Sequence, residues 1–279
     1  MTRIAYCVMV HKNPDQVARC LKMIYTKEDL FYYQIFRTKN TPSIDVWREA
    51  LSTENKNNAF LFSNFTGSYA TFRFVKAVLE AMNFFQENNY DYFINLSGQC
   101  YPIQPIPQIK QELGATNAAY LNYEPLPSKN LWNGGLNRIQ NYWFNVGKYR
   151  FHIPKIQKHL PYHLKPYWGW NWFCLPKKFV DYIIQYITDH PKLIPYFSYS
   201  LCSDEIFFQT ILMNSPFKSE VVNEYKRYIE WKNKDDAHPA ILTSEDFPKI
   251  LNSGMWFARK FDMNVDSKIL DMIDKSIGI

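Results

Sequence analysis

Apolar residues in the first hundred positions follow two alternating patterns. Short continuous apolar runs are typical of buried strands, and apolar residues three or four positions apart mark one face of a helix. The runs predict strands over residues 4–10, 31–36, 59–63 and 92–96, and the helical spacing predicts helices over 14–25, 45–51 and 68–88. This alternation favours an α/β fold, in which a mainly parallel sheet carries helices on both faces.

The second half of the chain is less regular. Residues 114–165 contain several Pro, Gly and Trp residues and predict a long irregular excursion over the sheet. Long loops of this kind usually act as lids or binding loops. We expect regular structure again as a strand over 170–175, a helix over 176–188, a helix that begins near 203, and three elements over 246–251, 255–261 and from 267 onward.

The carboxyl ends of the predicted strands locate a candidate ligand site, because ligands of parallel α/β sheets bind outside these ends. His11 follows the first strand, a loop follows Phe36 at the end of the second, and Ser97-Gly98 follows the fourth. We therefore expect these residues at one rim of the sheet. A lone histidine at a strand end is more often structural than functional, so both roles stay open for His11.

The composition narrows the class of protein. Hydrophobic residues at 47% and aromatic residues at 18% indicate a packed globular chain. The 8 Trp and 20 Tyr suit stacking on sugar rings or bases as well as a core. The net charge of +6 comes without a dense basic block. It therefore argues against a nucleic-acid arm, and it suits a phosphate-bearing substrate or a loose approach to an anionic membrane surface.

The cysteines and the start of the chain indicate the cellular compartment of the protein. Five cysteines, odd in number and without a close pair, argue against a disulfide framework and a zinc site, and favour a reducing cytoplasm. The apolar run at 4–10 is too short for a signal peptide, and no stretch of about 18 apolar residues could span a bilayer. We expect a cytoplasmic protein, peripheral to the inner face of the membrane at most.

The stretch Cys202-Ser203-Asp204-Glu205 places two adjacent carboxylates before an apolar, helix-like run. Ser203 or Asp204 could cap that helix, because their side-chain oxygens can accept the N–H groups of its first turn. Glu205 would then lie near the positive end of the helix dipole, where a carboxylate can act as a general base if a substrate hydroxyl reaches it. The alternative is an ordinary capping sequence.

Five stretches in order along the chain carry a family resemblance. They are Ile4-Ala5-Tyr6 with Val10-His11, the helix start at Ser68, residues 92–103, Ser203-Asp204-Glu205 with Gln209-Thr210, and residues 257–262. Together they resemble the core-2/I-branching β-1,6-N-acetylglucosaminyltransferase family, which also contains the peptide O-xylosyltransferases. The resemblance implies a single GT-A-type domain over 1–279, with a Rossmann-like nucleotide-binding half (1–113) and an acceptor and catalytic half (114–279). A bacterial member is expected.

The resemblance also implies the chemistry. In similar enzymes the glutamate of the Asp-Glu pair is the base of an inverting single displacement, which makes Glu205 the catalytic residue here. Asp204 would support the helix start or an acceptor hydroxyl. No Asp-x-Asp metal motif is present, so metal-independent catalysis is implied, with Arg259 and Lys260 at the donor diphosphate. The alternative for this pair is a solvated strand end.

Further site residues follow from position and alignment. The expected nucleotide-binding residues are His11, Arg37, Lys39, Arg73, Ser97 and Gly98. The expected acceptor-binding residues are Trp231, Asp204, Glu124, Arg138 and Trp170, with Trp172 nearby. A pyranose can stack on an aromatic face, although Trp231 could equally be a core residue.

The chain departs from the family pattern at three places. Ala240 lies near the position of a phosphate-contacting arginine, so either Arg259, Lys234 or His238 takes over its role, or the leaving group is less well stabilised. Arg37-Thr38-Lys39 lacks the acid of the vertebrate Asp-Arg-Lys sequence that helps to hold uridine, and Cys100 replaces a common acid. The donor sugar is therefore left open.

These observations predict an inverting, metal-independent glycosyltransferase without a cofactor. It would move a sugar, most simply GlcNAc, from a UDP-sugar to a hydroxyl of a glycan acceptor, including a lipid-linked one. The alternatives are another donor such as UDP-xylose, a non-catalytic protein that binds carbohydrate or nucleotide sugar, and a nucleic-acid-binding domain. The interleaved acidic residues and the absence of a recognised motif disfavour nucleic acid as a partner.

Overall fold

The chain forms two compact units, each assembled from separate stretches of sequence. The computed structural model describes residues 1–52, 56–66, 71–146, 149–233 and 238–278. Unit 1 comprises residues 1–67, 89–117 and 226–279, and unit 2 comprises residues 68–88 and 118–225. The C-terminal stretch thus belongs to the same unit as the N-terminal strands, and the boundaries of the units differ from a division at residue 113.

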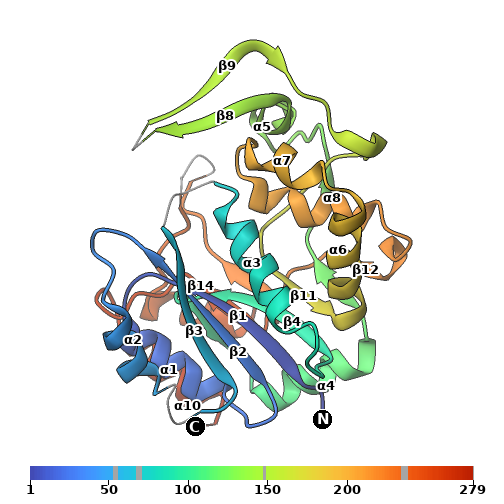
Figure 1. Cartoon of the computed structure of the whole chain (residues 1–279). Coiled ribbons are helices and arrows are strands. Elements are labelled where there is room, and N and C mark those ends of the chain that lie inside the picture. Colours follow the sequence, from blue (N-terminus) through green and yellow to red (C-terminus); the bar gives the residue numbers. More distant parts are fainter. Residues whose placement is uncertain (53–55, 67–70, 147–148, 234–237, 279) are drawn as a thin grey trace. The chain divides into compact units, whose positions relative to one another are not determined.

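Unit 1 is built on four parallel strands in the spatial order β4–β1–β2–β3. Figure 1 shows these strands side by side. They are β1 (Ile4–Val10), β2 (Leu30–Arg37), β3 (Ala59–Thr66) and β4 (Tyr92–Ser97). Since all four run in the same direction, the parallel α/β arrangement expected from the alternating pattern is confirmed for this unit.

The remaining elements of unit 1 are five helices, a 3₁₀ turn and a small second sheet among the described residues. The helices are α1 (Pro14–Ile24), α2 (Ile44–Leu51), α4 (Ile106–Thr116), α9 (Phe247–Leu251) and α10 (Lys268–Ser276), and the turn is η6 (Ser244–Asp246). The second sheet has the order β13–β14–β5, formed by β13 (Arg227–Ile229), β14 (Phe257–Arg259) and β5 (Cys100–Pro102).

The core of unit 1 follows from the apolar patterns. Every residue of β1 is buried, so both faces of this strand are covered. Helix α1 begins with a proline at its first turn, where no backbone N–H is needed, and buries the predicted face of Val17, Cys20, Leu21 and Ile24. Gly98, just after β4, is tightly packed, because a Cβ there would lie 2.8 Å from Val17 Cγ2.

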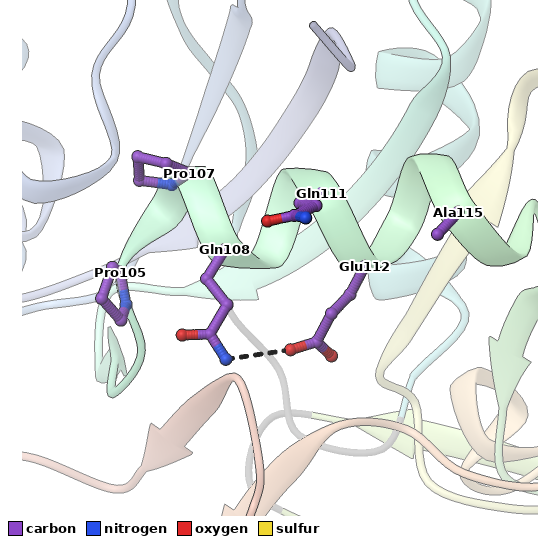
Figure 2. Close-up of a pocket in the computed structure, with 6 residues that line it drawn as sticks. All are labelled: Pro105, Pro107, Gln108, Gln111, Glu112 and Ala115. Atoms are coloured by element: carbon purple, nitrogen blue, oxygen red, sulfur yellow. Dashed lines mark hydrogen bonds between the residues drawn. The ribbon is translucent and has the colours of Figure 1, made fainter.

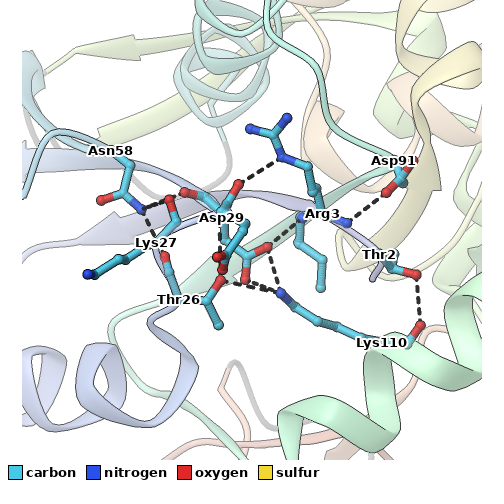
Figure 3. Close-up of polar contacts among 10 residues, drawn as sticks. Thr2, Arg3, Thr26, Lys27, Asp29, Asn58, Asp91 and Lys110 are labelled. Carbon is cyan, nitrogen blue, oxygen red and sulfur yellow. Dashed lines mark hydrogen bonds and ion pairs between the residues drawn. The ribbon is translucent and has the colours of Figure 1, made fainter.

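A buried ion pair fixes the amino ends of the strands in unit 1 (Figure 3). The Lys110 ammonium on α4 lies 2.6 Å from one Asp29 carboxylate oxygen and 2.8 Å from the other, and neither side chain is more than 2% exposed. Asp29 also accepts a hydrogen bond from the Ile4 backbone N–H at the start of β1. Asp29 itself directly precedes β2, so one carboxylate ties α4, β1 and β2 together.

Unit 2 contains short strands and helices. The strands are β6 (Ala119–Leu121), β7 (Glu124–Pro125), β8 (Asn141–Val146), β9 (Tyr149–Gln157), β10 (Tyr167–Trp168), β11 (Phe173–Pro176) and β12 (Val221–Val222). The helices are α3 (Arg73–Phe84), α5 (Asn137–Gln140), α6 (Lys177–Asp189), α7 (Leu193–Ser198) and α8 (Phe207–Met213). Four 3₁₀ turns are η2 (Trp132–Gly135), η3 (Pro161–His163), η4 (Ser203–Glu205) and η5 (Lys218–Glu220).

Helix α3 supplies part of the core of unit 2. Its residues Val75 and Met82 are buried at the predicted helical spacing, as is Phe72 just before it. The Phe72 ring meets Phe207 of α8 edge-on, with 5.6 Å between ring centroids. The predicted helix start at Ser68 lies outside the described residues.

Two expectations for the second half of the chain are wrong. Residues 114–165 are not an irregular excursion, because β8 and β9 form a long antiparallel hairpin within them. Strand alternation is masked there by aromatic residues on both faces, such as Trp143 and Phe144. The helix expected near residue 203 begins at Phe207, and the preceding residues form the short turn η4.

We predict that Lys110→Met lowers the free energy of unfolding by about 3–5 kcal/mol, because Asp29 is left buried without its counter-charge. Urea denaturation monitored by circular dichroism measures this change. Asp45→Ala, which removes the exposed Arg48–Asp45 pair, is the matched control and should cost less than about 1 kcal/mol. Equal losses in both variants would contradict the role given to the buried pair.

Candidate functional site

In unit 2, Glu205 forms an ion pair with Arg138. Arg138 Nη1 lies 2.5 Å from Glu205 Oε2, and about a fifth of each side chain is exposed. Arg138 donates to the Oε2 atom of Glu205. The other carboxylate oxygen, Oε1, accepts no hydrogen bond from another described residue and can accept one from a ligand. A charge-assisted hydrogen bond of this length fixes the direction in which the carboxylate points.

The backbone around Glu205 holds the carboxylate in place. Cys202 adopts a left-handed conformation (φ 48°, ψ 45°) that starts the η4 turn, and the Glu205 N–H donates to the Cys202 carbonyl at 3.0 Å. The Glu205 carbonyl accepts from the Gly169 N–H at 2.9 Å. A Cβ on Gly169 would lie 2.0 Å from the Asn122 carbonyl oxygen, so only glycine fits this close approach.

The predicted capping role of Ser203 and Asp204 is wrong. Neither side chain caps η4 or α8; the cap positions are Cys202 and Ile206. Ser203 Oγ is buried without a hydrogen-bond partner among the described residues. Asp204 instead accepts a hydrogen bond from Asn171 Nδ2 at 3.0 Å. The two carboxylates are thus held by a turn, not by the first turn of a helix.

Burial governs the acid–base properties of this pair. It raises the pKa of Glu205 above the ordinary glutamate value, and the Arg138 charge opposes this rise. Burial also raises the pKa of Asp204, and the charge of the adjacent Glu205 raises it further. Burial raises the pKa of the neighbouring Cys202 thiol to about 12, which leaves this cysteine protonated and a poor nucleophile. A carboxylate with a raised pKa is a stronger base, as proton abstraction requires.

Other predicted acceptor residues lie in the same unit. Strand β7 pairs with β10, which places Glu124 opposite Trp168, one residue before Gly169. Asn130 donates to Glu124 and is the main cause that lowers its pKa. The half-buried Trp170 ring meets Trp168 edge-on at 5.9 Å. Gly169 bonds to the Glu205 backbone and lies between Trp168, which is opposite Glu124, and Trp170. Glu124 and Trp170 are therefore linked to Glu205 through the backbone at Gly169.

In unit 1, positive charges gather after the first strand. Lys12 Nζ lies 2.5 Å from Asp262 Oδ2, and Asn13 Nδ2 donates to the other oxygen at 2.8 Å. Burial lowers the pKa of Lys260, and the positive charges of Lys12 and Arg259 lower it further, whereas Asp262 raises it. An anion would relieve this repulsion between like charges.

A cavity of about 350 Å³ borders this cluster. It is lined by Lys12, Asn13, Pro14, Asp15, Gln16, Asn40, Pro42, Met263 and Asn264. It combines the start of α1, where backbone N–H groups point outward, with the loop after β2. Its size and its polar lining are adequate for part of a nucleotide.

Lys12 and Asp262 are the members of this cluster that the sequence reasoning did not single out as site residues. The position of Lys12 beside His11, at the carboxyl end of β1, is the signal that could have identified it. Burial lowers the pKa of His11, and the Lys12 and Lys260 charges contribute in the same direction. His11 is thus kept neutral beside the two cations.

The other predicted nucleotide residues are spread over both units. Arg37 and Lys39 are exposed at and after the end of β2, and Arg73 is exposed at the start of α3 in unit 2. Ser97 Oγ accepts from the Gln99 N–H at 3.3 Å and so shapes the turn after β4. Cys100 Sγ accepts the Ser97 N–H at 3.4 Å, the kind of contact an acid at this position could also make.

The segment around Ala240, where the family pattern has an arginine, lies beside Lys260. The Ala240 N–H donates to the Glu230 carbonyl, and the Leu242 N–H donates to the Lys260 carbonyl at 2.8 Å. Of the residues considered as replacements, His238 is exposed and Lys234 lies outside the described residues. Trp231 is half-buried in unit 1.

A second hollow lies along α4, and Figure 2 shows the side chains that line it. It encloses about 670 Å³ and is lined by Pro105, Pro107, Gln108, Gln111, Glu112 and Ala115. Gln108 donates to Glu112, whose other oxygen accepts from the Trp256 indole. Gln108 and Glu112 are therefore engaged within the protein.

Two features are missing from the part of the chain that the structure describes. No group of three or more His, Cys, Asp or Glu side chains is arranged to hold a metal ion. No helix there is both long enough and apolar enough to cross a bilayer.

Sequence comparison identifies the family. The model of the Core-2/I-Branching enzyme family matches residues 4–251. The chain belongs to this family. The predicted family is thereby confirmed, and with it the mostly parallel α/β fold class predicted as GT-A-type.

Named relatives are glycosyltransferases. The chain is 25% identical over 293 residues to xylosyltransferase 2 of Mus musculus, which covers 98% of the chain and 33% of the relative. It is 30% identical over 196 residues to β-glucuronosyltransferase GlcAT14A of Arabidopsis thaliana, which covers 68% of the chain and 43% of the relative. The chain thus spans about a third of the length of the xylosyltransferases it matches.

Among solved structures, the apo form of mouse xyloside xylosyltransferase 1 aligns with a TM-score of 0.41 and 11% identity. The alignment covers 91% of this chain and 97% of that chain.

Proposed function

We propose that this protein is an inverting glycosyltransferase that moves a sugar from a UDP-sugar to a hydroxyl of a glycan acceptor. The observation that carries the proposal is the partly exposed Glu205 carboxylate, oriented by Arg138 and made more basic by burial, in a chain of the Core-2/I-Branching family. An enzyme that activates a hydroxyl needs such a base, whereas a protein that only binds carbohydrate does not.

In the proposed reaction, Glu205 accepts the proton of the acceptor hydroxyl through its free oxygen. The acceptor oxygen then bonds to the anomeric carbon of the donor as the bond from that carbon to the diphosphate breaks. The electron pair of the broken bond leaves with UDP. Because a single displacement occurs, the anomeric configuration inverts and no sugar–enzyme bond forms.

The departing diphosphate is proposed to be neutralised by the cations of unit 1. Lys260, Arg259 and Lys12 offer positive charge at the carboxyl end of β1, where α/β folds bind nucleotides. Lysine supplies a compact charge, and arginine supplies paired donors for phosphate oxygens. The cluster supports a metal-independent mechanism, because the charge that a divalent cation would otherwise bring is already present.

The donor is proposed to be UDP-GlcNAc, with UDP-xylose and UDP-glucuronate as the alternatives that the names of the relatives suggest. Glu124, Arg138, Asp204 and Trp170 are the proposed acceptor contacts in unit 2. Trp231, Arg37, Lys39, Arg73, His11, Ser97 and Gly98 keep their predicted roles as proposals, as does a cytoplasmic location.

We predict that Glu205→Gln lowers the rate of transfer at least about 10³-fold while the affinity for the donor stays within about threefold, because only proton abstraction is lost. UDP release from a panel of UDP-sugars, with and without acceptor glycans and in EDTA, measures the rate. Isothermal titration with UDP measures binding. Glu220→Gln, at the exposed pair with Lys178, is the matched control and should retain wild-type turnover.

A wild-type protein that binds no nucleotide sugar and releases no UDP would overturn the proposal. Turnover retained in Glu205→Gln would instead remove Glu205 from the role of base and leave the transferase activity standing. Turnover that EDTA abolishes and added Mn²⁺ restores would contradict metal independence.

We predict that Lys260→Ala lowers kcat about 10²-fold or more, because the charge that develops on the leaving diphosphate loses its partner. Lys249→Ala is the matched control in the same unit, since this lysine is 62% exposed in a loose pair with Glu230. Steady-state kinetics on the donor identified by the panel measures both variants. If Lys260→Ala changes KM alone, Lys260 binds the donor without acting on the leaving group.

A further inference from the structure

Helix α5, which carries Arg138, depends on hydrogen-bond donors from other parts of unit 2. A helix of four residues leaves its own carbonyl groups unpaired and is too short to be stable alone. Each carbonyl of α5 accepts from a different donor. The Trp143 indole donates to Asn137 at 2.9 Å, the Leu201 N–H to Arg138 at 2.8 Å, the Tyr196 hydroxyl to Ile139 at 2.7 Å, and the Lys158 N–H to Gln140 at 2.8 Å. The neighbouring segments therefore set the position of Arg138.

Two of these donors lie on the segment that leads to Glu205. Tyr196 belongs to α7, and Leu201 directly precedes Cys202, where the η4 turn with Glu205 starts. Figure 1 shows α7 next to α5, as the hydrogen bond from Tyr196 requires. A shift of this segment relative to α5 would therefore change the separation of Arg138 and Glu205.

Lys158 forms hydrogen bonds to both segments. It directly follows β9, and its backbone N–H donates to α5. Its ammonium donates to the Tyr196 carbonyl at 2.7 Å and to Ser200 Oγ at 2.8 Å. The ammonium also lies 4.3 Å from the centroid of the Tyr196 ring. A single residue thus ties α5 to the end of α7.

Charge pairing does not account for the place of Lys158 in the fold. The residue is only 5% exposed, and no described carboxylate pairs with it. Burial lowers the pKa of Lys158 to about 7, because an ammonium without a counter-charge is costly to remove from water. Its contacts at this place are the hydrogen bonds to α5 and α7 and the faces of tyrosine rings.

We propose that Lys158 is a positioning residue for the glycosyl transfer proposed above, on which this role rests: it holds Arg138 in place against Glu205. Lys158 acts through Arg138, whose Nη1 atom lies 2.5 Å from Glu205 Oε2. The charge that lowers the pKa of Glu205 is that of Arg138. A misplacement of about 1 Å in a catalytic arrangement can lower a rate about 10²-fold, so the tie between α5 and α7 matters for turnover.

The pKa of Glu205 tests this role without any need for turnover. Carbon-13 NMR of the side-chain carboxyl groups measures it, and the loss of one signal in Glu205→Gln assigns the resonance. Lys158→Met should raise the pKa of Glu205 part of the way to its value in Arg138→Met, because the guanidinium is no longer held against the carboxylate. In the Arg138→Met background, Lys158→Met should cause no further rise, since no guanidinium is left to position.

Two further variants complete the design. The matched control is Lys192→Met, which removes an exposed lysine at the start of α7 and should leave the pKa of Glu205 unchanged. Tyr196→Phe removes the hydroxyl that donates to Ile139 but keeps the ring and every charge. It should raise the pKa of Glu205 in the same direction, and it decides the proposal alone if circular dichroism shows that Lys158→Met does not fold.

An unchanged pKa of Glu205 in folded Lys158→Met would overturn the proposal, as would an unchanged pKa in Tyr196→Phe where that variant decides alone. An equal rise in the wild-type and Arg138→Met backgrounds would also overturn it, because the Lys158 charge would then act on Glu205 directly and not through Arg138.

Transfer kinetics connect the role to the reaction. Lys158→Met should lower kcat about tenfold or more, while the affinity for UDP, measured by isothermal titration, stays within about threefold. An active wild type with unchanged kcat in Lys158→Met would contradict the positioning role. A wild type that releases no UDP from any UDP-sugar would contradict the proposed function instead, and the NMR titration would still decide whether Lys158 positions Arg138.

Discussion

The proposed chemistry depends on the contact between Glu205 and Arg138. A carboxylate that is largely removed from water is costly to ionise, and a guanidinium in direct contact offsets this cost. The two effects act in opposite directions on the pKa of Glu205, and burial is the larger. Without Arg138, the pKa of Glu205 would rise further, because burial would act without an opposing charge.

The cation cluster of unit 1 differs from the Glu205–Arg138 pair, because it brings like charges together. Burial lowers the pKa of Lys260, the charges of Lys12 and Arg259 lower it further, and Asp262, which pairs with Lys12, raises it. Like charges this close repel one another, and the diphosphate of the proposed donor would relieve this repulsion. In contrast, the buried Asp29–Lys110 pair is fully matched and serves the fold alone.

Much of unit 1 could be predicted from the sequence, because its parallel strands are continuous apolar runs and its helices have clear amphipathic spacing. The predictions failed where the local signal was ambiguous. Aromatic residues on both faces hid the alternation of β8 and β9. The acidic residues after Cys202 resemble a helix cap, but the left-handed backbone at Cys202 directs them into a separate turn.

Only part of the candidate site could be predicted from the sequence. Glu205, Arg259 and Lys260 were found through motifs, whereas Lys12 belongs to no motif; its position at the carboxyl end of β1 was the one sequence signal, and its contact with Asp262 comes from the structure. Arg138 was selected by position in the chain, and the contact with Glu205 gives it a specific part. Such contacts depend on which side chains the loops bring together over a separation of 67 residues, which no local pattern records.

The dependence of kcat/KM on pH in Arg138→Met and Arg138→Lys tests the central claim most directly. The acid limb of this profile reports the pKa of the essential base in the free enzyme. Since the Arg138 charge lowers the pKa of Glu205, its removal in Arg138→Met should move the acid limb to higher pH, and Arg138→Lys should move it less. An acid limb that stays in place in Arg138→Met, or moves to lower pH, would contradict the assignment of Glu205 as the base held by Arg138.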